Sequence, residues 1–167
     1  MAESGKLREK EVSSSSDPVS YTHLDVYKRQ HMACMYSAFA NDGSMIAPYL
    51  ETSGKRNVWK KDVFSKEAVS QLRSDLIQVI QDPEGTGHGA RLAETVLAGK
   101  TGTAELKASQ DDTSGTELGW FCVYNANGDR DDSLLLVTMT EDVKDRGGST
   151  YVVKNSRNIL KRFMPAD

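Results

Sequence analysis

Four consecutive residues, Lys100, Thr101, Gly102 and Thr103, combine groups suited to binding an anion. Lysine supplies a positive charge, and the two threonine hydroxyls can donate hydrogen bonds to a carboxylate. Glycine has no Cβ, so a strand backbone can approach a ligand more closely at position 102 than a side chain would permit. We expect the tetrad to bind an anionic acyl substrate. The tetrad alone is also compatible with a strand that carries one exposed lysine and a turn glycine.

The segments around the tetrad predict a small antiparallel sheet. Residues 95–98 form an apolar run that leads into the tetrad, and residues 117–124 and 133–140 form two further strand patterns. Residues 125–132 join the last two and are rich in turn formers, which favours a hairpin. The tetrad should therefore lie on a strand of this sheet.

Three apolar stripes at helical spacing predict the helices that cover the sheet. The first begins at His31 and stops at Asn41-Asp42-Gly43, and the second begins after the cap residue Ser65 and stops at Asp82-Pro83. The third closes the chain and should pack on the same sheet face as the second. The stripes are Met32, Met35, Tyr36, Phe39 and Ala40; Val69, Leu72, Leu76, Val79 and Ile80; and Val152, Ser156, Ile159, Leu160 and Phe163.

The polar residues beside these helices are expected to be structural or solvated. Ser37 lies off the apolar stripe and has no neighbours that would make it a nucleophile. Residues 84–89 are glycine-rich and predict a flexible loop just before the tetrad strand. His88 in this loop could face a substrate, but a solvated loop histidine is the preferred interpretation.

Several linked motifs resemble the end of the transpeptidase domain of class B penicillin-binding proteins. The motifs are "GKTGTAE", the later "GWF" and a closing helix, together with "MACMYSAFANDGSMIAPYL" and "VWKKDVFSKEAVSQL", which are similar to the low-affinity, methicillin-resistance branch. The resemblance covers His31 to about Phe163. It implies an α/β fold of the α+β type, the C-terminal part of the penicillin-binding and serine β-lactamase-like fold. Three antiparallel strands with about three packing helices are expected, and one sheet edge should lack its partner strand.

The resemblance also implies a function, a peptidoglycan D,D-transpeptidase that forms a serine acyl-enzyme. Lys100 would contribute positive potential, and the hydroxyls of Thr101 and Thr103 would bind the carboxylate of a β-lactam or a peptidoglycan stem peptide. Gly102 would allow close approach, and the Thr103 N–H would be half of an oxyanion hole. A Ser-x-x-Lys sequence, which supplies the nucleophile in this family, does not occur in the chain. The single Ser-x-Asn match, Ser156-Arg157-Asn158, follows the tetrad instead of preceding it, so the chain is expected to be inactive.

Other interpretations share or replace this chemistry. A serine β-lactamase or a β-lactam sensor domain would grip a carboxylate with the same tetrad, and a noncatalytic module has no surface motif in its favour. Gly99-Lys100-Thr101 also resembles the end of a phosphate-binding loop. That loop requires glycine where Glu94 stands, and an amphipathic helix after Lys100 where a polar hairpin is expected.

Composition excludes several other classes. The formal net charge of −3 gives no electrostatic footprint for nucleic acid. No segment is long and apolar enough to span a membrane. The family resemblance implies an extracytoplasmic parent protein, anchored to the membrane through an N-terminal segment absent from this chain. Cys34 and Cys122 lie in apolar patterns and predict buried free thiols. The three histidines lack the spacing of zinc ligands, and the tip at residues 110–115 lacks the alternation of a calcium-binding loop. We therefore expect neither a metal site nor a cofactor.

The chain divides into three segments. Residues 1–17 are charged and then serine-rich, and are expected to be a disordered, unrelated leader. Residues 18–30 match nothing in the family. Back-translated with suitable codons, 19–30 form an inverted repeat resembling two transposase mosaic ends joined head to head, so we interpret 18–30 as a chimeric scar. Residues 31–167 are the expected truncated transpeptidase domain.

Overall fold

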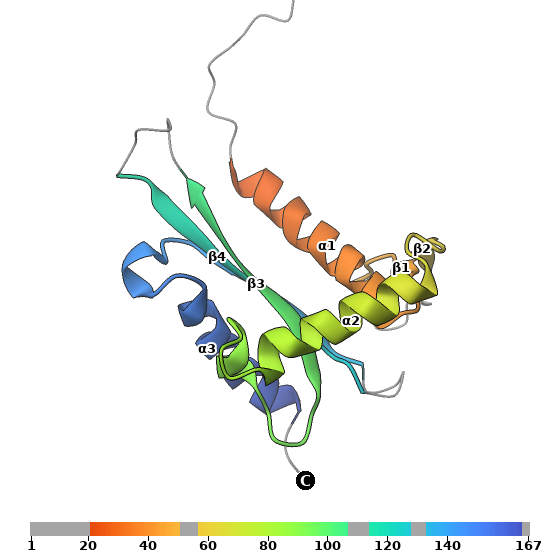
Figure 1. Ribbon diagram of the computed structural model, residues 1–167. Helices are drawn as coiled ribbons and strands as arrows, with labels where there is room; N and C mark the ends of the chain where they lie inside the picture. Colours follow the sequence, from red (N-terminus) through yellow and green to blue (C-terminus); the bar gives the residue numbers. More distant parts are fainter. Residues whose placement is uncertain (1–20, 51–56, 107–113, 128–132, 165–167) are drawn as a thin grey trace, which may run out of the picture.

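The computed structural model describes residues 21–50, 57–106, 114–127 and 133–164 (Figure 1). The expected leader at 1–17 lies outside the described residues, as do most of the tip at 110–115 and most of the turn at 125–132. The helices are α1 (Tyr21–Ala40), α2 (Lys66–Gln81) and α3 (Ser149–Phe163), with short 3-10 turns η1 (His88–Ala90) and η3 (Lys144–Arg146). The strands are β1 (Met45–Ile46), β2 (Val58–Lys60), β3 (Leu97–Leu106), β4 (Thr116–Asn125) and β5 (Leu135–Thr140).

The main sheet is antiparallel, with β4 between β3 and β5. The β3–β4 register runs from Leu97↔Asn125 to Leu106↔Thr116, so the whole of β3 is paired. Among the described residues, the second edge of β5 has no strand partner. The expected three-stranded sheet with three helices is confirmed.

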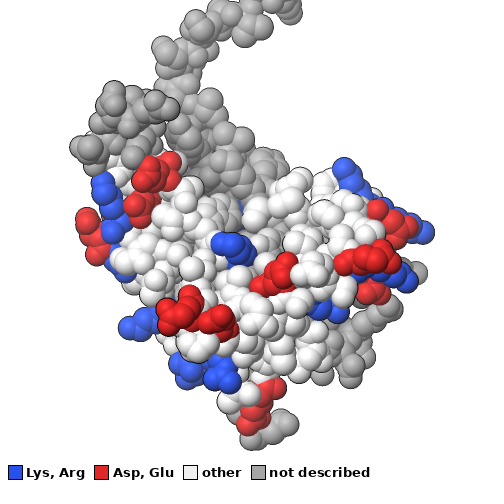
Figure 2. Space-filling view, viewed as in Figure 1, with Lys and Arg blue, Asp and Glu red and all other residues white. Residues whose placement is uncertain are grey.

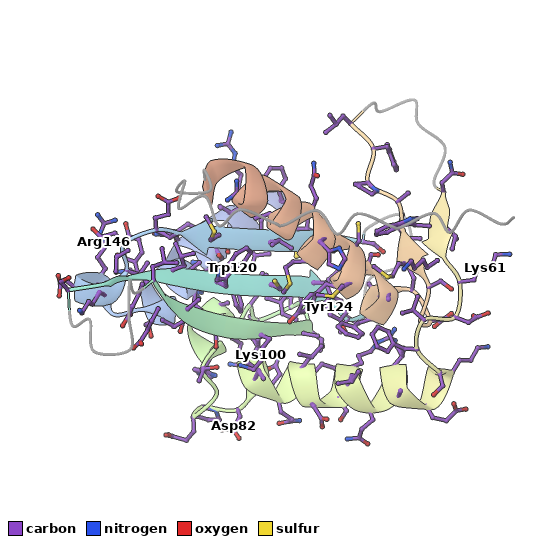
Figure 3. The ribbon with its side chains drawn as sticks, turned by 90° about the horizontal axis from the view of Figure 1, so that it is seen from above. Lys61, Asp82, Lys100, Trp120, Tyr124 and Arg146 are labelled. Atoms are coloured by element: carbon purple, nitrogen blue, oxygen red, sulfur yellow. The ribbon has the colours of Figure 1, made fainter. Side chains whose placement is uncertain are left out.

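Side-chain alternation along the strands divides the interior into two cores. On one face, Leu97, Phe121 and Val123 pack with α3, and on the other face Ala98 and Cys122 pack with α1. Figures 1 and 3 show α1 and α3 on opposite faces of the sheet. The first core also contains Val152, Val153 and Leu160 of α3, and the second contains Tyr36 of α1 and Tyr124 of β4.

Helix α2 lies beside β3 at the edge of the sheet and joins the two cores (Figure 3). Its N-terminus is fixed by Ser65, whose Oγ accepts a hydrogen bond from the Ala68 N–H at 3.2 Å. Leu76 contributes to the α1 core and Ile80 to the α3 core. The helix ends at Gln81, as expected two residues before Pro83.

Four details differ from the sequence-based expectations. Helix α1 begins at Tyr21 instead of His31, because residues 21–30 contain no glycine or proline to interrupt it. The short β1–β2 pair was not expected. Helix α2 lies at the edge of the sheet and contributes to both cores, so it meets the α3 face only in part, through Ile80. Within α3, Ile159 and Phe163 are 37% and 67% exposed while Val153 is buried, because the buried stripe is rotated toward Val153.

Candidate functional site

The Lys100–Thr103 tetrad lies in the middle of β3, where its side chains alternate between the two faces of the sheet. Lys100 pairs with Cys122, whose side chain belongs to the α1 core. Thr101 pairs with Phe121, whose side chain belongs to the α3 core. Lys100 and Gly102 therefore face α1, and Thr101 and Thr103 face α3.

The backbone alternates in the same way, and this places two amides of the tetrad on the open edge of the sheet. The Ala126 N–H bonds to the Val96 carbonyl at 2.7 Å, which sets the hydrogen-bonding phase of the β3–β4 pair. In an antiparallel pair every second residue bonds to the partner strand. Lys100 lies four residues after Val96, so its backbone also bonds to β4. The backbone groups of Thr101 and Thr103 therefore point away from β4.

The outer edge of β3 is covered at one end and open at the other. Residues 97–99 are buried beside α2, and Thr101 is only 8% exposed. Gly102 is half-buried, and from Thr103 onward the strand is exposed. The hydroxyl and the N–H of Thr103 are therefore accessible to a ligand that lies along this edge.

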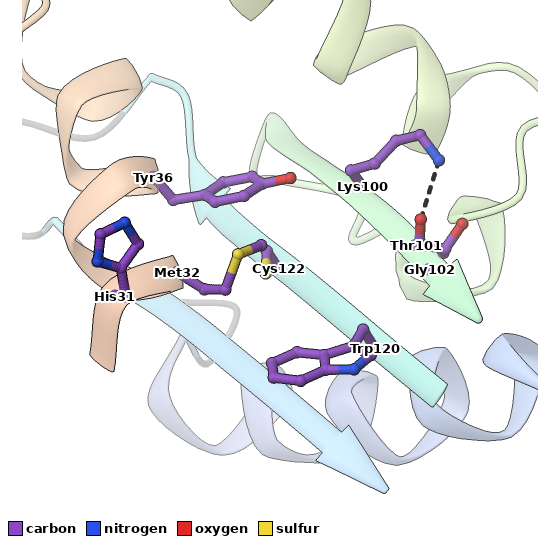
Figure 4. Close-up of a pocket in the computed structure, with 8 residues that line it drawn as sticks. All are labelled: His31, Met32, Tyr36, Lys100, Thr101, Gly102, Trp120 and Cys122. Carbon is purple, nitrogen blue, oxygen red and sulfur yellow. Dashed lines mark hydrogen bonds between the residues drawn. The ribbon is translucent and has the colours of Figure 1, made fainter. Parts of the chain in front are cut away.

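Lys100 adds a positive charge to the same edge. Its Nζ donates a hydrogen bond to the Thr101 carbonyl at 2.9 Å (Figure 4), and the side chain is exposed. In the part of the chain that the structure describes, no carboxylate forms an ion pair with this ammonium. Its remaining donors are available to an anion. On the face drawn in Figure 2, acidic and basic side chains are interspersed and form no broad basic surface.

The hydroxyl of Thr101 is bonded to a residue that the sequence did not single out. Thr86, in the loop after α2, places its Oγ1 2.7 Å from the Thr101 Oγ1. His88 in the same loop, expected to be a solvated histidine, is half-buried, and its Nδ1 lies 3.1 Å from the Ile80 carbonyl oxygen. The available signal for Thr86 was its position between two glycines just before the tetrad strand.

A cavity of about 400 Å³ lies beside Lys100, between α1 and the sheet (Figure 4). Met32 and Tyr36 line it from α1, and Trp120 and Cys122 line it from β4. Figure 4 shows the Tyr36 hydroxyl directed toward the Lys100 side of the cavity. Met32 and Met35 both pack against the core clusters, and Met32 also lines this cavity.

The two glycines of the strand differ in what surrounds them. A Cβ at Gly99 would lie 2.5 Å from the Cys122 carbonyl oxygen, so the fold itself requires glycine there. A Cβ at Gly102 would come no closer than 3.6 Å, to the Trp120 Cβ, which is ordinary contact. The fold therefore leaves room for a side chain at position 102.

The Ser156-Arg157-Asn158 sequence lies on α3, within the core. Ser156 is fully buried, and its Oγ is 2.7 Å from the Thr138 Oγ1. Thr138 also donates to the Phe121 carbonyl at 3.1 Å. These contacts tie α3 to the sheet, on the face opposite Lys100.

The other residues considered as chemical groups have structural roles. Ser37 donates to the Cys34 carbonyl at 2.6 Å and accepts from the Ile46 N–H at 2.9 Å, which fastens β1 to α1. Both cysteines are buried free thiols, as expected, and burial raises the pKa of Cys122 to about 12. Gly99-Lys100-Thr101 lies within β3, so no helix begins there to hold a phosphate.

The described residues offer neither a metal site nor a membrane-spanning helix. They contain no group of three or more histidine, cysteine, aspartate or glutamate side chains arranged to hold a metal ion. No helix among them has the length and hydropathy needed to cross a membrane.

Comparisons with known proteins point to one family. The family model for the penicillin binding protein transpeptidase domain matches residues 2–164. Penicillin-binding protein 3 of Bacillus subtilis (strain 168) is 39% identical over 129 residues, which are 76% of this chain and 19% of that protein. The chain thus spans under a fifth of this relative.

Two solved structures share the fold. One, from Atopobium parvulum DSM 20469 and assigned as a peptidoglycan glycosyltransferase, matches with a TM-score of 0.60 and 22% identity over 80% of this chain and 33% of that one. The other is the TP domain of penicillin-binding protein 3 from Burkholderia pseudomallei, with a TM-score of 0.57 and 19% identity over 80% of this chain and 42% of that one.

Proposed function

Because this chain belongs to the penicillin-binding protein transpeptidase family, we propose that the Lys100–Thr103 edge of β3 is the carboxylate-binding wall of a D,D-transpeptidase site. The ligand is the terminal carboxylate of a peptidoglycan stem peptide, or the carboxylate of a β-lactam. It lies along the open edge of β3, beside the Lys100 ammonium. No cofactor or metal is required for this step.

The spacing of the tetrad supports this proposal. Residues two apart on a strand are separated by roughly 6–7 Å. The side chains of Thr101 and Thr103 therefore lie close enough for both hydroxyls to donate to one carboxylate. The Thr103 N–H then points to the next carbonyl of the ligand, where it would be one donor of an oxyanion hole.

We further propose that this chain binds such ligands without forming an acyl-enzyme. Acylation needs a serine with an adjacent base, and the chain contains no Ser-x-x-Lys sequence. Its single Ser-x-Asn match holds the buried Ser156. One oxyanion donor is worth about 3 kcal/mol, which does not replace a missing nucleophile.

The motifs support a finer assignment of the parent protein. We propose a class B penicillin-binding protein close to the low-affinity, methicillin-resistance branch, on the strength of "FANDG", "VWKKDVFSKEA" and "GKTGTAELK". The parent would act outside the cytoplasmic membrane, held by an N-terminal anchor.

We also propose that residues 18–30 are an assembly scar and that residues 31–167 derive from the transpeptidase domain. Helix α1 runs across the boundary at residue 30 and the family match begins at residue 2, so neither of them marks the proposed junction. The DNA sequence of the native gene is the test. Sequencing the native gene without a transposase step should give different codons for residues 19–30. Intact codons there would contradict the scar.

The accessible Thr103 N–H beside Lys100 is the observation that carries the binding proposal, and NMR tests it. We expect N-acetyl-D-alanyl-D-alanine, titrated into ¹⁵N-labelled protein, to shift the amide signals of Gly102 and Thr103. The same peptide with a C-terminal amide should shift them much less, because it lacks the carboxylate. Lys100→Met should weaken the response to the acid. Equal responses to the acid and the amide, or shifts confined to other strands, would refute the proposal.

A further inference from the structure

We propose that Thr86 is a positioning residue, which orients the Thr101 hydroxyl so that its proton is directed to the ligand carboxylate. This inference rests on the proposed function, because it assigns a role within the same binding edge. Thr86 itself need not touch the ligand.

The hydroxyls of Thr86 and Thr101 each have a single proton to donate, and this limits the hydrogen bonds that they can make. Their oxygens are 2.7 Å apart, so one of them donates its single proton to the other. If Thr101 donates to Thr86, it has no proton left for a carboxylate. If Thr86 donates to Thr101, the Thr101 proton is free for the ligand. An arriving carboxylate selects the second arrangement, and the two bonds then strengthen each other.

The burial of the two threonines fits these unequal roles. Thr101 is 8% exposed, so its hydroxyl has little access to water and depends on protein partners. Thr86 is exposed, so its hydroxyl can donate to Thr101 or accept from it at small cost, because water can make the other hydrogen bonds of this hydroxyl. Thr86 thus acts as the adjustable partner and Thr101 as the fixed one.

The loop that carries Thr86 is held by its own backbone against the end of α2. The Gly87 N–H donates to the Val79 carbonyl at 3.0 Å, and the Gly85 N–H donates to the Asp82 carbonyl at 2.9 Å. A Cβ at Gly85 would lie 2.3 Å from the Val79 carbonyl oxygen, so this approach requires glycine. The loop is therefore fastened on both sides of Thr86, contrary to the flexible loop expected from its composition.

Thr101 is consequently fixed at two atoms. Lys100 binds its carbonyl oxygen at 2.9 Å, and Thr86 binds its hydroxyl. A β-branched side chain has few χ1 rotamers, so one hydrogen bond to the hydroxyl is enough to select one of them. Removing the Thr86 hydroxyl should leave the fold intact and release the Thr101 rotamer.

Three variants separate this role from a general structural one. Thr86→Val removes the hydroxyl and keeps the shape, while Thr86→Ser keeps the hydroxyl. Thr116→Val is the matched control, because its Oγ1 also makes a hydrogen bond, to Asp142 at 2.9 Å, and Thr116 pairs with Leu106 at the end of β3, away from Thr101. The dissociation constant of N-acetyl-D-alanyl-D-alanine is measured for each by NMR titration. Thermal unfolding monitors the fold.

We expect Thr86→Val to weaken binding by roughly three- to tenfold, the equivalent of one ordinary hydrogen bond. Thr86→Ser and Thr116→Val should bind like the parent chain. Unchanged affinity in Thr86→Val, or equal losses in Thr86→Val and Thr116→Val, would overturn the inference.

A second measurement applies even if the parent chain does not bind the dipeptide, which would refute the proposed function separately. Three-bond couplings of Thr101 report its χ1 rotamer in the ligand-free protein. One χ1 rotamer of Thr101 should dominate in the parent chain and in Thr86→Ser. In Thr86→Val the couplings should be averaged over several rotamers. A single, unchanged rotamer in Thr86→Val would overturn the positioning role.

Discussion

Alanine at the two glycines of the tetrad strand should have opposite effects on stability. At Gly99 the new Cβ would lie 2.5 Å from the Cys122 carbonyl oxygen and 3.1 Å from the Val123 Cα. Both are backbone atoms of the central strand and cannot rotate aside. At Gly102 the nearest atom is the Trp120 Cβ at 3.6 Å, which requires no adjustment.

The magnitudes follow from packing and chain entropy. Forcing an extra methyl into a closed site costs about 3 kcal/mol, because the two strands must separate locally. Replacing glycine by alanine in a strand stabilises the fold by about 0.5–1 kcal/mol, because the unfolded chain loses conformational entropy. Gly99→Ala should therefore lose about 2 kcal/mol, and Gly102→Ala should gain about 0.5–1 kcal/mol. Gly102→Ala should nevertheless bind N-acetyl-D-alanyl-D-alanine less well, since the family resemblance implies that Gly102 allows close approach of the ligand.

Urea unfolding followed by tryptophan fluorescence measures both changes in the free energy of unfolding. Each variant serves as the control for the other, because both make the same substitution three residues apart on one strand. A loss of more than about 1 kcal/mol in Gly102→Ala would refute the claim that the fold tolerates a side chain there. A change of less than about 0.5 kcal/mol in Gly99→Ala would refute the steric argument.

Three other predictions concern the scaffold. Leu160→Ala, at a fully buried site, should cost about 2–5 kcal/mol in urea unfolding, and Ile159→Ala, at a site 37% exposed, less than about 1 kcal/mol; equal losses would contradict the α3 packing. Ser65→Ala should cost about 1 kcal/mol through loss of the α2 cap, with Ser65→Asp retaining stability, and no loss would contradict the cap. Burial raises the pKa of Cys122 to about 12, above its unfolded value of about 8.5, so this thiol contributes stability below pH 8.5 that is lost as the pH rises toward 12. The urea midpoint should therefore be lower at pH 10.5 than at pH 7.5, and the difference should be smaller in Cys122→Ala. An equal difference in both proteins would contradict a stabilising role of the buried Cys122 thiol.

The sheet and the placement of the tetrad were predictable because their signals are local. Alternation along residues 117–124 already separates Phe121 and Val123 from Cys122, and the structure places them in the two different cores. Ser65 and Pro83 bound α2 through side-chain chemistry within one turn. Such features need no knowledge of the tertiary structure.

The partner of Thr101 was not predictable, because its contact depends on how a loop docks. Thr86 and Thr101 meet only after α2 lies along β3 and the loop is fastened to its end. The β1–β2 pair was missed for another reason, since strands of two and three residues are shorter than any period can reveal. In α3, Ile159 and Phe163 fit the apolar stripe but lie on its margin, and the sequence alone does not show which side of a wide stripe meets the sheet.

We propose above all that this chain has the carboxylate-binding wall of a transpeptidase site without its nucleophile. Intact-mass spectrometry after incubation with excess benzylpenicillin tests it most directly, with an active penicillin-binding protein as the positive control. We predict that the chain keeps its unmodified mass while the control gains one penicilloyl group. A stoichiometric gain of the same mass by this chain would contradict the account.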